Sequence, residues 1–290
     1  METQIRTKLP MYEASPLIDP TKIPVVGFLG GVRGKEILDE YQGRAKADYN
    51  SAKALNVLSY EDGLVKGSNP PSIVLLNQIL RQEGLRTADQ VDLERALKTG
   101  ALDLGGTYED SALILRSPEN PNKALAKILQ EQIQARNPKI KRPVMIPLYG
   151  LELVNDPNSN YALSFKLRDN AKIIYAPILN KQGRFSSEDI DENGIPKNVG
   201  DKGPRNLYSG NSGLSRLYLV RGLGLYSGGV DLANSGSFGR VVVVQEGGEA
   251  TAQNLKDRIV GEVNESYERQ LAELTTRRER ALRAIEGNGN

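Results

Sequence analysis

The chain has 290 residues, of which 38 are basic and 36 acidic, and it contains neither histidine nor cysteine. It therefore cannot form a disulfide, a Ser-His or Cys-His catalytic pair, or the imidazole and thiolate ligand sets that zinc prefers. A formal net charge of +2 gives no whole-protein attraction to nucleic acid or anionic membranes, so such binding would need a local patch.

The first 34 residues are rich in proline and glycine and predict an irregular N-terminal arm, whose apolar stretch 23–29 adds a strand or packs as an anchored arm. They lack the apolar segment of a secretory signal, and the apolar runs of the chain are too short to cross a bilayer. We therefore expect a cytoplasmic protein with no membrane contact. Residues 27–35 resemble a phosphate loop in their setting, but Leu29 and Glu36 do not fit a Walker A pattern, so a flexible arm is the interpretation.

Residues 35–140 have a mainly helical pattern of apolar side chains. The pattern predicts one strand and four helices: a strand over 111–116, and helices over about 35–60, 73–83, 88–98 and 122–136, with Thr87 capping the third helix. The second and third helices have the proportions of a helix-turn-helix. The third helix carries acidic residues that oppose DNA binding, so an ordinary helical hairpin is expected.

Residues 141–248 alternate between apolar and polar side chains, which predicts β-strands. Three segments separated by turn-forming residues predict an antiparallel meander: 144–154, 161–168 and 173–179. A polar insertion follows at about 180–206. Further strands are expected near 214–220, 223–226 and 240–245.

Residues 249–290 predict a long C-terminal amphipathic helix followed by a short tail. Apolar side chains form a stripe at spacings of mostly three and four: Leu255, Ile259, Val263, Tyr267, Leu271, Leu274, Ala281 and Ile285. Two interpretations of residues 251–286 stay open. The stripe packs on the protein's own body, or it pairs with another chain as a short coiled coil.

These elements predict an α+β fold. A helical N-terminal part packs on a mostly antiparallel meander sheet, and the long C-terminal helix follows. The predicted parts are 1–34, 35–140, 141–248 and 249–290.

Several segments are similar to a known set of sequences. They are PVMIPL at 143–148, LRD at 167–169 with APILN at 176–180, and GLSRLYL at 213–219 with GRVVVV at 239–244. In these segments the chain resembles an uncharacterised family of hypothetical proteins from environmental archaeal genomes. The resemblance covers about residues 65–245 and implies no activity, cofactor or site residue.

The segment 189–194 matches the first half of a calcium loop, with oxygen-bearing side chains at Asp189, Asp191 and Asn193 and a glycine at the sixth position. The match ends there, because Gly200 stands where an EF-hand needs a bidentate glutamate. An acidic turn without metal is the first interpretation. A Ca²⁺ or other divalent-metal module, with hydrolytic chemistry as an extension, is the alternative.

Lys139, Lys141 and Arg142 form a basic cluster that suits contact with phosphates. Six tyrosines of the β part suit a stacking surface beside it: Tyr149, Tyr161, Tyr175, Tyr208, Tyr218 and Tyr226. In strands, however, tyrosines more often pack at the edge of a core.

The sequence favours a non-catalytic binding or assembly protein that uses its sheet surface and residues 251–286 for a protein partner or for self-association. A single-stranded nucleic-acid binder is the first alternative and the metal module the second. No pair of carboxylates is identified as an acid and base, so the sequence assigns no catalytic residue and no cofactor beyond Ca²⁺ in the metal alternative.

Overall fold

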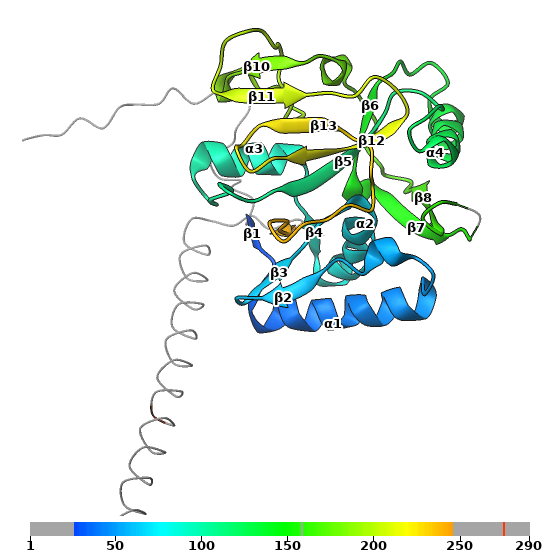
Figure 1. Cartoon of the computed structure of the whole chain (residues 1–290), viewed down its shortest axis with the longest axis vertical. Coiled ribbons are helices and arrows are strands. Elements are labelled where there is room, and N and C mark those ends of the chain that lie inside the picture. The colour runs from blue at the N-terminus through cyan, green and yellow to red at the C-terminus, as the bar shows by residue number, and fades with distance from the viewer. Residues whose placement is uncertain (1–25, 158, 246–274, 276–290) are drawn as a thin grey trace, which may run out of the picture. The chain divides into compact units, whose positions relative to one another are not determined.

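A curled seven-stranded sheet is the centre of the computed structural model, which describes residues 26–157, 159–245 and 275 (Figure 1). Its strands lie in the order β10-β11-β13-β12-β5-β6-β9. Their bounds are Gly183–Phe185, Arg205–Tyr208, Leu225–Gly229, Leu214–Leu219, Glu109–Leu115, Val144–Pro147 and Ile174–Tyr175. All neighbours are antiparallel except β11 and β13, which are parallel.

Strand β5 is buried on both faces of the sheet and separates two hydrophobic cores. Leu113 and Leu115 belong to the first core, whereas Ala112 and Ile114 belong to the second. Successive side chains of a strand point to opposite faces, which explains why these four residues divide between the cores. The uninterrupted apolar run at residues 112–115 is therefore explained by a strand that is covered on both sides.

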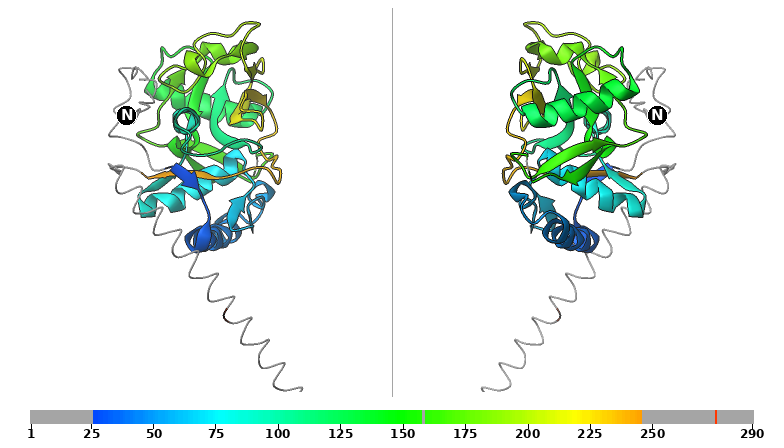
Figure 2. Two further views of the ribbon diagram at one scale, coloured as in Figure 1. Left: turned by 90° about the vertical axis from the view of Figure 1, so that its left-hand side faces the viewer. Right: turned by 90° about the vertical axis from the view of Figure 1, so that its right-hand side faces the viewer.

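Four α-helices accompany the sheet in the part of the chain that is described. They are α1 (Gly31–Asp48), α2 (Pro70–Leu80), α3 (Gln90–Thr99) and α4 (Lys123–Arg136). Helices α1, α2 and α4 contribute to the first core, and α3 contributes to the second. Figure 2 shows α1 at the end of this folded body that lies opposite β10 and β11. Ten of the 11 residues of α2 are buried, so this helix is enclosed by protein on all sides.

Local chemistry sets the ends of α2 and α3. The side chain of Asn69 accepts from the Ser72 amide at 2.8 Å, and prolines occupy the first turn of α2, where no N–H is needed. Asp89 and Asp92 form the equivalent capping box of α3. Helix α3 ends at Gly100, whose φ of +67° is the left-handed conformation that glycine adopts readily.

Three smaller sheets complete the described chain. One has the order β1-β14-β4, with bounds Val26–Phe28, Val242–Gln245 and Leu85–Thr87. Strands β2 (Ser59–Glu61) and β3 (Leu64–Lys66) form a hairpin whose two-residue turn is Asp62-Gly63. Both turn residues have positive φ, as a type I′ turn requires. Strands β7 (Leu151–Asn155) and β8 (Leu163–Leu167) form the third sheet.

The α+β class and the mostly antiparallel strands are confirmed. The predicted meander is confirmed in part. Strands β7 and β8 pair antiparallel, as expected for the segments 144–154 and 161–168, but among the described strands β9 pairs with β6 and not with β8. The 3₁₀ turn at Leu148–Gly150 breaks the segment 144–154 and lets its second half leave the main sheet.

The helical predictions differ from the structure in two places. Helix α1 starts at Gly31, inside the predicted arm, and ends at Asp48 instead of near residue 60. Strand β1 agrees with the strand alternative for residues 23–29. The connection between α2 and α3 contains β4, which pairs with β14, so these helices are not a simple hairpin.

The seven-stranded sheet contains strands from two of the predicted parts, 35–140 and 141–248. Strand β5 comes from residues 35–140, and its neighbours β6 and β12 come from residues 141–245. The polar insertion 180–206 contains β10, a 3₁₀ turn and the start of β11. The predicted C-terminal helix lies outside the described residues, apart from Thr275. Within the described ranges, no helix is long and apolar enough to span a bilayer.

Candidate functional site

A row of tyrosine rings crosses neighbouring strands of the main sheet. Its members are Tyr208 on β11, Tyr226 on β13, Tyr218 on β12 and Tyr108 immediately before β5. We call these four residues the tyrosine row. Consecutive ring centroids are 5.8, 5.3 and 5.9 Å apart. The strands that carry the row lie side by side in Figure 1.

The register of the strands brings the rings together. Tyr208 is paired with Tyr226 across β11 and β13, and Tyr226 is paired with Tyr218 across β13 and β12. The neighbouring leucines of these strands belong to the second core: Leu207, Leu217, Leu219 and Leu225. The alternation of side chains therefore places the tyrosines on the opposite face. The Tyr208 side chain is 44% exposed, and the other three are half-buried.

A glycine makes room for an arginine within the row. Gly229 is paired with Arg216, and a Cβ atom at Gly229 would lie 2.9 Å from the Arg216 side chain and 3.1 Å from the Tyr218 ring. The Arg216 guanidinium lies 4.5 Å from the centroid of Tyr218 and 5.8 Å from that of Tyr108. These are cation–π distances, so Arg216 links two rings of the row.

Asp110 forms an ion pair with Arg216. The shortest nitrogen–oxygen distance between them is 3.3 Å, and both side chains are buried. Ser68 donates to the second carboxylate oxygen of Asp110 at 2.7 Å. Burial raises the pKa of Asp110, whereas Arg216 and then Ser68 lower it. The charge of Arg216 is thus balanced inside the protein.

Tyr108 is fixed by hydrogen bonds at the end of the row. Its hydroxyl accepts from the Gly236 amide at 2.6 Å and donates to the Ser68 carbonyl at 3.1 Å. Its backbone N–H donates to the carbonyl of Phe238 at 3.2 Å. Since the loop that follows β13 supplies two of these partners, the Tyr108 end of the row is well ordered.

Exposed arginines give the surface around the row a positive charge. Strands β10, β11, β12 and β13 contain neither aspartate nor glutamate, and the two acids of β5, Glu109 and Asp110, are buried. Arg216 is paired with Asp110, and Arg205 is buried against Glu94 of α3, so neither adds free charge to this surface. Arg184 is exposed, and its neighbour Phe185 faces the second core, so Arg184 points to the same face as the row. Arg221, also exposed, follows β12. This face suits an anionic partner with flat groups.

Three of the six predicted stacking tyrosines lie elsewhere. Tyr149 stacks against Arg86, with 4.8 Å between the guanidinium carbon and the ring centroid. The Tyr161 hydroxyl donates to the Asn122 side chain at 3.0 Å. Tyr175 is exposed on the edge strand β9. The sequence pattern does not point to Tyr108, because this residue precedes its strand and only the fold brings it to Tyr218.

The basic cluster Lys139, Lys141 and Arg142 is exposed in the loop between α4 and β6. Arg142 hydrogen-bonds to the Gln130 side chain. The loop adjoins the β9 edge of the sheet, because Val144 is paired with Tyr175. Sheet order separates this edge from β11 and β13, so the cluster and the tyrosine row are distinct surfaces.

In the predicted calcium loop, the carboxylate of Asp191 contacts backbone amides. It accepts from Asn193 N at 2.8 Å and from Ile195 N at 3.1 Å, which is the bonding of an Asx turn. Asp189 is exposed, and its carbonyl accepts from Lys197 N at 2.7 Å. Gly194 has a φ of +76°, and a Cβ there would lie 2.6 Å from the backbone of Gln90. The loop thus docks on the start of α3.

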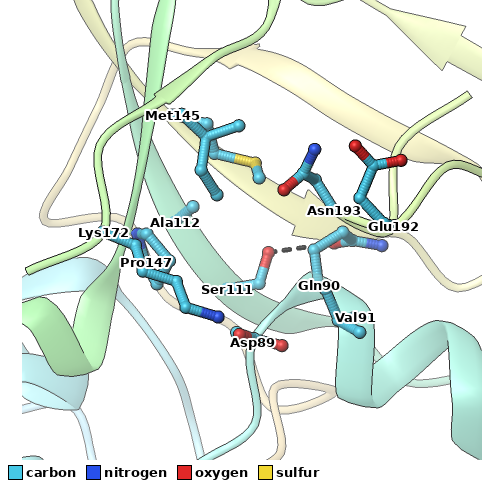
Figure 3. A pocket seen from close by; sticks show the side chains of 11 residues that line it. Asp89, Gln90, Val91, Ser111, Ala112, Met145, Pro147, Lys172, Glu192 and Asn193 are labelled. Carbon is cyan, nitrogen blue, oxygen red and sulfur yellow. Dashed lines mark hydrogen bonds between the residues drawn. The ribbon is translucent and has the colours of Figure 1, made fainter.

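A small cavity lies beside this loop (Figure 3). Lys172 and Asp89 lie on one side of it and Asn193 and Glu192 on the other, and Ser111 donates to Gln90 at 3.0 Å. Burial, followed by the charge of Asp92, raises the pKa of Asp89 to about 6. The volume is about 20 Å³, which is room for about one water molecule.

Metal binding has limited support in the described ranges. They contain no group of three or more aspartates and glutamates placed to hold a metal ion. A metal site at Asp189, Asp191 and Asn193 therefore stays a prediction, to which the structure adds no coordination geometry.

Comparison of the chain with protein-family models, with curated proteins and with solved structures gives no match.

Proposed function

We propose that the protein is a non-catalytic binding protein that binds single-stranded nucleic acid on the tyrosine row. The observation that carries the proposal is the contiguous row of four rings, beside which Arg184 and Arg221 are exposed while the acids Glu109 and Asp110 are buried. Bases stack on aromatic side chains with little dependence on sequence, and the strand's phosphates favour a basic surround.

Two features favour a single strand over a duplex. Paired bases present only their edges in the grooves, whereas unpaired bases expose flat faces that can lie on tyrosine rings. The row also offers consecutive rings in one direction across β11, β13 and β12, as an extended strand requires. The competing explanation is that cross-strand aromatic pairs stabilise the sheet without binding anything.

Binding of a fluorescently labelled oligonucleotide to the full chain tests the proposal. We expect Tyr226→Ala to weaken binding about 5- to 150-fold, because stacking contributes about 1–3 kcal/mol per base. Tyr175→Ala is the matched control, since Tyr175 is 47% exposed on the far edge of the sheet. Equal binding by both variants, or no binding by the wild type at low salt, would refute the proposal.

A stability measurement separates the two explanations of the row. If the rings serve only the sheet, Tyr226→Ala lowers the free energy of unfolding and no oligonucleotide binds to the wild type. If they also bind bases, the folded variant retains its circular dichroism spectrum and loses affinity. The basic cluster Lys139, Lys141 and Arg142 remains a proposed second phosphate contact, whose removal reduces the salt dependence of binding.

A further inference from the structure

Arg221 is an exposed arginine beside the tyrosine row that pairs with no acid among the residues described. It follows β12 and stacks on Phe238, with 3.7 Å between the guanidinium carbon and the ring centroid. Arg216 differs from it, because Asp110 balances its charge. Arg221 is therefore a cation held in place by an aromatic ring instead of by a carboxylate.

Phe238 extends the aromatic surface past the end of the row. It is 46% exposed, and its carbonyl accepts from the backbone N–H of Tyr108 at 3.2 Å. The guanidinium of Arg221 stacks on this ring, which brings its charge next to the Tyr108 end of the row.

Stacking prepares the guanidinium for an anion. The planar group lies against one ring, so its rotational freedom is reduced before any ligand binds. The N–H groups of the guanidinium lie in its plane, so two of them can donate parallel hydrogen bonds to the oxygens of one phosphate. Guanidinium groups also stack on flat aromatic groups, so an exposed arginine suits contact with a base as well as with a phosphate.

We propose that Arg221 and Phe238 form a phosphodiester-binding subsite at the Tyr108 end of the tyrosine row. When the bases of a nucleic-acid strand stack on Tyr226 and Tyr218, a phosphate of its backbone accepts two hydrogen bonds from the Arg221 guanidinium. This inference rests on the proposed function, since the phosphate belongs to the strand that the row binds. It assigns a specific role to Arg221 that simple attraction to a basic surface does not require.

The test measures the affinity of the full chain for an oligothymidylate of about 12 nucleotides at several salt concentrations. A single-strand contact to one phosphate contributes about 0.7 to the slope of log K against log salt. We expect Arg221→Ala to reduce the slope by about this amount and to weaken low-salt binding about 10-fold. Arg221→Lys retains the slope but loses affinity, because lysine lacks the planar fork.

Two further variants complete the experiment. Phe238→Ala leaves the charge in place but removes its support, so affinity falls while the slope is retained. Arg95→Ala is the matched control, because Arg95 is exposed on α3, which packs on the other face of the sheet. We expect its slope and affinity to equal those of the wild type.

The outcomes separate this inference from the proposed function. Wild-type binding that Tyr226→Ala weakens, together with an unchanged slope in Arg221→Ala, overturns the subsite and leaves the tyrosine row intact. An equal loss of slope in Arg221→Ala and Arg95→Ala also overturns it, because the effect is then general charge. No binding by the wild type overturns both proposals.

Discussion

Single residues of this protein carry polar groups that the sequence alone would place at the surface. Glu109 is 2% exposed in β5, and one of its carboxyl oxygens has no hydrogen-bond partner among the described residues. Burial raises its pKa to about 8, whereas the hydrogen bond from Thr107 opposes that shift. Such a carboxyl is neutral near pH 7, which is why the strand tolerates it in a buried position.

Glu109 makes stability depend on pH. In the unfolded chain its pKa is near the ordinary value of 4.5, so the folded state binds the extra proton between that value and about 8. Stability is therefore highest below this window and falls as the pH rises through it. Between pH 6.5 and 8.5 the loss should be about 2 kcal/mol, because one pKa unit corresponds to about 1.4 kcal/mol.

Urea unfolding of Glu109→Gln at these two pH values checks the prediction. The variant should lose the pH-dependent difference, since glutamine does not ionise. Glu119→Gln is the control, because that side chain is 62% exposed. A pH dependence that persists in Glu109→Gln would assign the effect to another group.

At the scale of elements, buried ion pairs connect secondary structures that are distant in the sequence. Arg205 of β11 donates to both carboxylate oxygens of Glu94 on α3, at 2.6 Å each, and the two side chains are 5% and 7% exposed. The Arg205 guanidinium also lies 4.7 Å from the centroid of Phe185. This pair joins α3 to the same strand that carries Tyr208.

Removal of one partner should be costly. Arg205→Met leaves a buried carboxylate without its cation, and we expect a loss of about 3–5 kcal/mol in the free energy of unfolding. The double variant with Glu94→Leu should recover most of this loss, because both charges are then absent. Chemical denaturation of the single and double variants measures the difference.

The matched control is the exposed pair of Arg44 and Glu40, which is 3.2 Å apart on α1. Arg44→Met should change stability by less than about 1 kcal/mol. If the double variant of the buried pair were as unstable as the single one, packing of the arginine stem would be the main contribution and not its charge.

At the scale of the whole molecule, association through residues 251–286 remains a prediction. Light scattering of the full chain and of a chain that ends at Gly248 measures it. The compact unit that spans Val26–Gly247 makes the shorter chain a reasonable folding unit. We expect an oligomer for the full chain and a monomer for the shorter one, because the apolar stripe has near-heptad spacing. Two monomers of equal stability would contradict the assembly role.

The sequence by itself determined the fold class and most helices and strands. Apolar periodicity located α2, α3 and α4, and the alternation over residues 163–167 predicted β8, because these patterns reflect local geometry. The C-terminal end of α3 followed from Gly100, whose effect is confined to one turn, whereas the N-cap of α3 is Asp89 and not the predicted Thr87. The absence of histidine and cysteine excluded whole classes of catalytic and metal site, because no other side chain supplies an imidazole or a thiolate.

Only the tertiary structure decided which strands are neighbours and which side chains meet. The pairing of β9 with β6 and the parallel contact of β11 with β13 join segments whose partners no local pattern specifies. The tyrosine row follows from that pairing, since Tyr108 and Tyr218 are 110 positions apart in sequence and 5.9 Å apart as rings. Strand register is a property of the assembled sheet, and for this reason the site emerged only with the fold.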